Sequence, residues 1–323
     1  MSLDGVSLVS LDVDKMYNNI SQELGFSAAK EYLNSRHPSS QSVGCNENED
    51  PFVSTESLLE GLDLCINNNN FSFGEKFYKQ VGGVGTGVVC APPYACLAMG
   101  KFEDQVFNTM TEERRFIELI LFWKRFIDDI LLLFKGTEAE CDNLVSWLNS
   151  IIPGLIKLKC DFGHDNLEFL DLRIMIVGGR LETEIFVKPT NQQLYLDYKA
   201  IHPTHSKDAI VYSQALRVVQ LCSQPNSTQQ HLQRLSEKFE NRGYPKNVLE
   251  KAFKKATAVP RKELIHGQRK VKSCKDIKVR LILTYNSKNP PLHKWLREGK
   301  QFLTTPEGKE IGKNLQIVNY ILD

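Results

Sequence analysis

The chain has 323 residues, a formal net charge of +1, 41% hydrophobic residues and 24% charged residues, values that indicate a globular protein with room for two or three domains and exclude a disordered chain. No apolar run approaches the length of a membrane span, and the first residues lack the basic and then apolar layout of a signal peptide. Eight cysteines without a CxxC pair argue against a zinc ribbon. We therefore expect an intracellular protein, nuclear or cytoplasmic, with no membrane partner.

The small net charge hides an asymmetry along the chain. Residues 232–323 contain 21 of the 40 Lys and Arg residues but only 9 of the 39 Asp and Glu residues. An acidic region followed by a basic one is expected when one part holds cations and another binds a polyanion. Ordinary solvated helical faces would give the same counts, so composition does not decide between the two interpretations.

The first elements in chain order are a strand, two helices and a hairpin. The alternating stretch VSLVSLDV predicts the strand, and SQELGFSAAKEYLNS predicts a helix capped by Ser21. Residues 35–54 are polar and turn-rich, which indicates an exposed insertion. A second helix is expected to begin with a capping box at Thr55, and FSFGEKFYKQ predicts a hairpin that turns at Gly74.

A glycine-rich turn and an apolar hairpin follow. The glycines of GGVGTG lead into a helix that begins at Pro92, and such backbone can approach a ligand closely, although the lysine of a phosphate-binding P-loop is absent. In FWKRFIDDILLLF, Asp128 and Asp129 interrupt an apolar segment. An unpaired buried carboxylate costs several kcal/mol. These two therefore either reach water at a tight turn or hold a metal ion.

The remaining elements of this region indicate an α+β fold with an antiparallel sheet. A helix is expected near EAECDNLVSWLNSII, and three strands follow, with turns at Gly163 and at Gly178–Gly179. The strand that ends at Asp12 and the hairpin at Asp128 bring carboxylates from distant parts of the sequence, as a two-metal site requires. Ligation by oxygen alone favours Mg²⁺ or Mn²⁺ over zinc.

Three stretches resemble motifs A, B and C of reverse transcriptases in the form found in Penelope-like retroelements: LDVDKMYNNI, GTGVVCAPPYACLAMGKFE and KRFIDDILLLF. LEFLDLRI, FENRGYP and LTYN resemble the continuation of that family, so the likeness runs from about residue 6 to residue 297. The resemblance implies a right-hand polymerase palm over residues 1–188, a helical thumb over residues 189–258 and a basic C-terminal extension over residues 259–323.

The implied function is RNA-directed DNA polymerase activity. A primer 3′-OH would attack the α-phosphate of a deoxynucleoside triphosphate, with an RNA template, a DNA primer and two Mg²⁺ or Mn²⁺ ions. The basic tail would follow the product duplex through sequence-independent, salt-sensitive contacts.

The resemblance also implies roles for single residues of the palm. Asp12 would be the motif A metal ligand, with the carbonyl of Val13 beside it. Asp128 would be the second metal-bridging carboxylate and Asp129 its catalytic partner at the hairpin tip. Tyr17 would be a steric gate that collides with a ribose 2′-OH; the alternative is a core aromatic residue.

The glycine turn is expected to lie under the incoming nucleotide, with Gly87 and Pro92 as nucleotide-binding residues; a plain turn is the alternative. Asp14 is expected to be an exposed neighbour of the site rather than a ligand. Lys157 or Lys159 falls where related enzymes keep a proton-donating lysine, although a solvated lysine is the favoured interpretation.

In the thumb, the resemblance implies that His202, His205, Lys207 and Arg217 face the nucleic-acid backbone. A zinc site of the two histidines with Cys222 is disfavoured, because a proline follows the first histidine and no second compact ligand pair exists.

The chain also departs from the family pattern. From the resemblance we expect the chain to lack a fingers region before motif A and a GIY-YIG-type endonuclease, and a separate chain that supplies either of them is a candidate partner. Thr86 and Val89 replace the usual methionine and lysine of motif B, and Phe126 replaces a tyrosine in motif C. Two alternatives to an active enzyme therefore stay open: a catalytically silent remnant that binds RNA or an RNA/DNA hybrid, and a fragment that does not fold alone.

Overall fold

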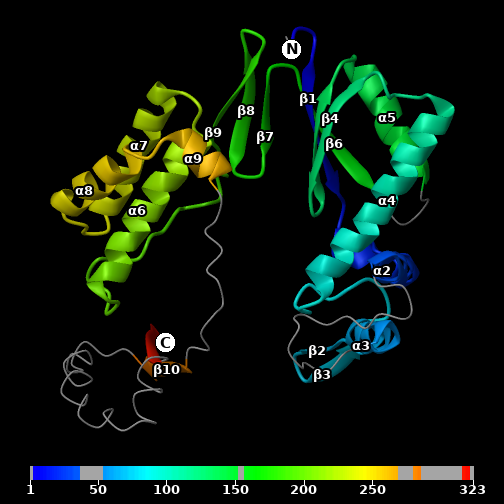
Figure 1. Cartoon of the computed structure of the whole chain (residues 1–323), viewed down its shortest axis with the longest axis horizontal. Helices are drawn as coiled ribbons and strands as arrows, with labels where there is room; N and C mark the ends of the chain where they lie inside the picture. Colours follow the sequence, from blue (N-terminus) through cyan, green and yellow to red (C-terminus); the bar gives the residue numbers. More distant parts are fainter. Residues whose placement is uncertain (1–2, 37–53, 152–155, 268–278, 285–314, 321–323) are drawn as a thin grey trace. The chain divides into compact units, whose positions relative to one another are not determined.

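A computed structural model of the chain describes residues 3–36, 54–151, 156–267, 279–284 and 315–320 (Figure 1). The chain divides into two compact units, Met1–Leu181 and Glu182–Asp323, and the boundary falls inside strand β9 (Arg180–Ile185). The predicted palm, thumb and extension boundaries at residues 188 and 258 remain predictions. Most of the expected insertion, and most of the basic extension, lies outside the described residues.

The first unit is built on a sheet of four antiparallel strands in the order β4-β5-β1-β6. The strands are β1 (Ser7–Val13), β4 (Ile120–Phe126), β5 (Asp129–Phe134) and β6 (Leu158–Gly163). The sheet confirms the predicted mixture of helices with antiparallel strands. Strand β1 lies between β5 and β6, which explains why most of its residues are buried.

The described helices of this unit include the four expected ones and one short helix, Met16–Asn19, that was not predicted. They are α1 (Met16–Asn19), α2 (Gln22–Arg36), α3 (Thr55–Asn67), α4 (Ala91–Glu113) and α5 (Glu138–Ile151). Ser21 Oγ accepts a hydrogen bond from the Leu24 amide at 3.3 Å, so the expected cap of α2 is present. The cap of α3 is Ser54 rather than Thr55, because Ser54 Oγ accepts from the Ser57 amide at 3.1 Å.

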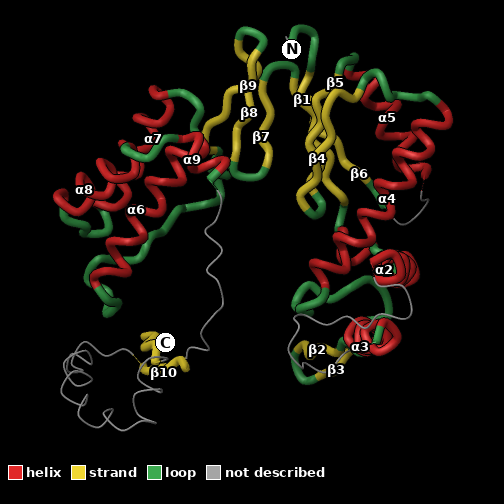
Figure 2. The backbone as a smooth tube through the Cα atoms, viewed as in Figure 1, coloured by secondary structure: helices red, strands yellow, loops and turns green. Residues whose placement is uncertain are grey.

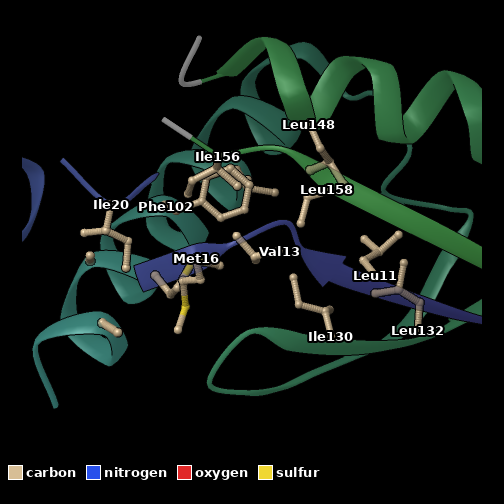
Figure 3. Close-up of a cluster of buried hydrophobic side chains, with 14 of the residues drawn as sticks. Leu11, Val13, Met16, Ile20, Phe102, Ile130, Leu132, Leu148, Ile156 and Leu158 are labelled. Carbon is tan, nitrogen blue, oxygen red and sulfur yellow. The ribbon is translucent and has the colours of Figure 1, made fainter. Parts of the chain in front are cut away.

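The main core of the unit lies between this sheet and its helices (Figure 3). Alternate residues of the strands supply it, and Phe102 of α4 and Leu148 of α5 pack against them. Burial of each such side chain contributes about 1.5–3 kcal/mol. The strand residues labelled there are Leu11, Val13, Ile130, Leu132 and Leu158.

A second sheet covers part of the opposite face of β1. It contains β7 (Asn166–Phe169), β8 (Leu172–Val177) and β9, and Leu167 and Ile174 pack against Leu8. The prediction of three strands after α5 was therefore wrong, since β6 to β9 are four. The additional turn begins at Leu170 with φ of 55°, and a leucine there carries none of the usual turn signals.

The hairpin predicted around Gly74 is present as β2 (Asn70–Phe73) and β3 (Lys76–Lys79), and Gly74 has a φ of 61°. Every residue of the two strands is exposed.

The second unit is mainly helical (Figure 2). Its helices are α6 (Thr204–Leu221), α7 (Pro225–Glu240), α8 (Lys246–Thr257) and α9 (Arg261–His266), and the short strands β10 (Val279–Thr284) and β11 (Leu315–Tyr320) pair in parallel. Val211, Phe239 and Leu249 lie in a core that is separate from that of the first unit. Across the described residues of both units, no helix is long and apolar enough to cross a membrane.

Candidate active site

Asp12 lies on the face of the main sheet opposite the helical core. Its neighbours Leu11 and Val13 are buried, whereas Asp12 is exposed, as alternation along a strand requires. Asp12 is directly opposite Asp129 of β5 and Lys159 of β6 in the strand register. Directly opposite residues of antiparallel strands point to the same face. One face of the sheet therefore carries two carboxylates and an ammonium group side by side.

Asp128 occupies the turn between β4 and β5, next to this row. The turn consists of Ile127 and Asp128, and Ile127 adopts a φ of 57°. The Val13 amide donates a hydrogen bond to the Asp128 carbonyl at 3.3 Å. The end of β1 and the turn, more than a hundred residues apart in the sequence, are thus joined through their backbones.

The negative charges of this region affect one another. Burial raises the pKa of Asp12, and the charge of Asp128 raises it further, whereas the Lys159 ammonium acts in the opposite direction. Burial followed by the Asp128 charge also raises the pKa of Tyr17. Like charges opposite each other on neighbouring strands destabilise a sheet. A cation at this place would relieve the repulsion.

The donor atoms present fit a hard divalent cation. The carboxylates of Asp12 and Asp128 and the carbonyl of Val13 are oxygen donors, and Mg²⁺ is usually bound by one or two carboxylates together with water and substrate phosphates. Among the residues that the structure describes, no group of three or more His, Cys, Asp or Glu side chains is arranged to hold a metal ion. The metal-binding roles of Asp12, Val13 and Asp128, and the catalytic role of Asp129, remain predictions.

Lys159 is tied to the site by an ion pair that the sequence did not reveal. Its ammonium bonds to the carboxylate of Asp14, although the lysine side chain is 61% exposed. This contact lowers the pKa of Asp14 and raises the pKa of Lys159. Asp14 also donates its backbone amide to the Lys157 carbonyl at 2.8 Å. Of the two candidate lysines, Lys159 is therefore the one whose charge acts on Asp12.

The glycine turn lies against Tyr17. The Val84 amide donates to the Tyr17 carbonyl at 2.7 Å, and a Cβ added at Gly83 would lie 2.6 Å from the carbonyl oxygens of Tyr17 and Asn18. Gly83 also has a φ of 66°, so only glycine fits there without strain. Tyr17 itself is half-buried and packs against the core, as the alternative of a core aromatic predicts, and its role as a steric gate stays a prediction.

The two predicted nucleotide-binding residues are less constrained than Gly83. Gly87 is exposed, and a Cβ added to it would meet no atom within 4 Å. Pro92 is exposed in the first turn of α4. Their predicted roles stay predictions. Gly83 of the same turn, in contrast, faces the backbone of Tyr17 and Asn18.

In the second unit, the prediction for Lys207 is not supported. Its side chain is buried, and its ammonium donates to the carbonyls of Tyr198 at 2.7 Å and Ala200 at 3.1 Å. A lysine that satisfies backbone carbonyls inside the unit cannot also face a phosphate. His205 is exposed on the first turn of α6, whereas His202 and Arg217 are half-buried.

The fold is similar to that of solved polymerases. The telomerase from Candida albicans, solved in complex with a fragment of telomeric RNA, matches with a TM-score of 0.51 and 10% identity over 79% of this chain and 46% of the telomerase chain. The fold is polymerase-like. Two further structures match more weakly. Apo telomerase from Candida tropicalis, truncated at its C-terminal domain, matches with a TM-score of 0.43 and 13% identity over 55% of this chain and 35% of that chain. The RNA-dependent RNA polymerase of BmCPV matches with a TM-score of 0.46 and 13% identity over 73% of this chain and 20% of that chain.

The polymerase-like chain thus spans less than half the length of each of these polymerases. The family model of the animal helix-turn-helix domain matches residues 194–254, a stretch that contains α6 and α7 and most of α8. No sequence among curated proteins matches the chain.

Proposed function

We propose that the chain is the reverse transcriptase domain of a Penelope-like retroelement, an RNA-directed DNA polymerase that extends a DNA primer on an RNA template. One observation supports the proposal best. In a polymerase-like fold, Asp12 and Asp129 are opposite each other on the face away from the core, with Asp128 in the adjoining turn. That arrangement brings together the carboxylates of the motifs that resemble motifs A and C.

Each residue of the site would have its own role in the reaction. Asp12, Asp128 and the Val13 carbonyl would hold Mg²⁺ or Mn²⁺, ions that stabilise the attacking and leaving oxygens of a phosphoryl transfer. Tyr17, held by the Gly83–Val84 backbone, would exclude a ribose 2′-OH and so favour deoxynucleotides. The exposed Gly87 and Pro92 would leave room for the nucleotide and the template base.

Primer extension on a poly(rA)/oligo(dT) hybrid with Mg²⁺ or Mn²⁺ tests this proposal. We expect Asp128→Asn and Asp12→Asn to reduce extension about a hundredfold or more, because each removes a charged oxygen donor while keeping the size of the side chain. Asp142→Asn, a change at an exposed carboxylate on α5, is the matched control and should extend primers as the unchanged chain does. Equal extension by Asp128→Asn and the unchanged chain would contradict the proposal.

A second candidate function is binding of RNA or an RNA/DNA hybrid without catalysis. The observation that favours it is a set of exposed lysines on α8 and α9, partly within the helix-turn-helix match: Lys246, Lys251, Lys254, Lys255 and Lys262. Binding through these residues should weaken steeply with salt. Salt-sensitive hybrid binding by the unchanged chain, without extension in either metal, would support this function over the first.

A further inference from the structure

A largely but not fully buried ion pair connects helix α4 to the strand that leads into the Asp128 turn. Arg125 Nη2 lies 2.9 Å from Glu103 Oε2, and the two side chains are 13% and 18% exposed. Such a pair is weak evidence for stability, because two charges must leave water, but loss of one partner leaves the other charge desolvated. A pair in this place is better explained by a requirement for geometry.

The second carboxylate oxygen of Glu103 accepts a hydrogen bond from the same strand. Trp123 Nε1 donates to Glu103 Oε1 at 2.7 Å, and the Trp123 ring packs edge-to-face against Phe107 with 5.5 Å between centroids. Trp123 and Arg125 are two residues apart and share a face of β4, whereas Glu103 and Phe107 are four apart and share a face of α4. One carboxylate therefore holds two side chains of the strand at once.

Arg125 also forms a hydrogen bond with the turn itself. Its Nη1 donates to the Ile127 carbonyl at 3.0 Å. Ile127 has a φ of 57°, a conformation that is costly for a β-branched residue and needs support from its surroundings. Arg125 Nε is buried, and no described residue gives it a hydrogen-bond partner. The guanidinium is thus oriented through Glu103 and the Ile127 carbonyl, immediately before Asp128.

We propose that Glu103 is a positioning residue that, through Arg125, holds the Ile127 peptide and thereby fixes the turn that presents Asp128. The Glu103 bracket consists of Glu103, Trp123, Arg125 and the Ile127 carbonyl. Its effect on metal binding rests on the proposed function, whereas its effect on the turn does not. Glu103 bonds to Trp123 and Arg125 and acts on Asp128 only through them.

Amide hydrogen exchange of the full chain tests the effect on the turn. Glu103→Gln keeps the shape of the side chain but removes the charge that binds Arg125. We expect exchange around the turn, and at the Val13 amide that bonds to Asp128, to become about tenfold faster, as expected for loss of one charge-assisted hydrogen bond. Unchanged exchange at these amides would overturn the inference.

The same helix offers a matched control. Glu31→Gln removes an ion pair of 2.6 Å with Lys101 of α4, but Glu31 is 66% exposed and lies outside the bracket. It should leave exchange at the turn unchanged. Arg125→Lys is a second test, because lysine keeps the buried charge but cannot reach both Glu103 and the Ile127 carbonyl with a planar fork. Arg125→Lys tests the inference if Glu103→Gln does not fold. Amide exchange around the Asp128 turn of Arg125→Lys that is as slow as in the unchanged chain would overturn the inference.

Mn²⁺ binding, followed by the relaxation of water protons, separates this inference from the proposed function without any need for activity. In Glu103→Gln we expect the Mn²⁺ concentration at half-saturation to rise about tenfold, and in Glu31→Gln to stay the same. If Asp128→Asn binds Mn²⁺ as the unchanged chain does, the proposed function fails, and hydrogen exchange still decides the role of Glu103. If Mn²⁺ binding depends on Asp128 but not on Glu103, the positioning role is overturned.

Discussion

The two compact units place their polar residues by different rules. In the first unit, strand alternation separates the core residues Leu11 and Val13 from Asp12, which must then point to the opposite face. In the second unit, the buried Lys207 lies on a helix, and its ammonium donates hydrogen bonds to backbone carbonyls. The core of that unit includes Phe239, whose ring stacks on Tyr195 with 4.4 Å between the ring centroids. A charge on a strand is placed by its position in the sequence, but a charge on a helix is placed by what packs around it.

This difference explains which of the candidate site residues the structure brings together. The strand register brings Asp12 opposite Asp129, and these residues belong to the stretches that resemble motifs A and C. Lys207 has the charge of a nucleic-acid contact, but the chain before α6 folds over it and supplies two carbonyl acceptors. Long aliphatic stems such as that of lysine can be buried when the ammonium finds such partners.

Removal of a core phenylalanine from either unit should have the largest effect and would test whether the units unfold separately. Phe102 and Phe239 are fully buried and belong to cores that share no residue. We expect Phe102→Ala and Phe239→Ala each to lower the free energy of unfolding of its own unit by about 3–5 kcal/mol. Calorimetry combined with hydrogen exchange can assign each transition.

Phe73→Ala is the control for both, because Phe73 is 79% exposed and its loss should change stability by about 0.5 kcal/mol or less. A single unfolding transition that shifts equally with Phe102→Ala and with Phe239→Ala would show that the two units unfold together, not separately.

The glycine turn provides the next effect in size. Gly83→Ala should destabilise the first unit by about 3 kcal/mol, because it combines a positive φ with a clash against the carbonyls of Tyr17 and Asn18. Gly87→Ala has open space around its Cβ and should change the midpoint of chemical unfolding little. Equal midpoints for the two variants would contradict the close contact between this turn and Tyr17.

Lys207→Met tests the buried lysine of the second unit. Methionine keeps most of the stem but leaves the carbonyls of Tyr198 and Ala200 without the ammonium, so we expect a loss of about 1–2 kcal/mol in the free energy of unfolding. Lys251→Met, at an exposed position on α8, should leave stability unchanged. Fluorescence anisotropy with a labelled hybrid gives the second readout: weaker binding by folded Lys207→Met than by the unchanged chain would restore Lys207 as a nucleic-acid contact.

The ion pair of Asp14 and Lys159 should have the smallest effect, since the lysine is well exposed. The pKa of Asp14 is lowered by Lys159, so its contribution is present above the ordinary carboxyl pKa and is lost as the pH falls through the lowered value. We expect Asp14→Asn to lower the melting temperature of the first unit slightly at pH 7, and the difference from the unchanged chain to vanish in acid. A difference that grows as the pH falls would mean that the pair does not stabilise the folded state.

The sequence by itself determined several elements of the first unit and the alternation that separates Asp12 from Leu11 and Val13. Alternation, helical caps and glycine turns are local signals, and they predicted β1, the cap of α2, the hairpin at Gly74 and the hairpin that carries Asp128. The additional turn of Leu170 and Asp171 was missed because its first residue is an apolar leucine with a positive φ and no glycine or proline marks the turn.

Only the tertiary structure decided which residues support the site. The contact of Gly83 with Tyr17 and the pairing of Lys159 with Asp14 join elements that lie far apart in the sequence, and the contacts of Glu103 join α4 to β4, the strand that follows it. Such contacts depend on strand register and on the packing of α4 against β4. Neither is encoded within a single stretch, because each follows from how several apolar faces are buried together.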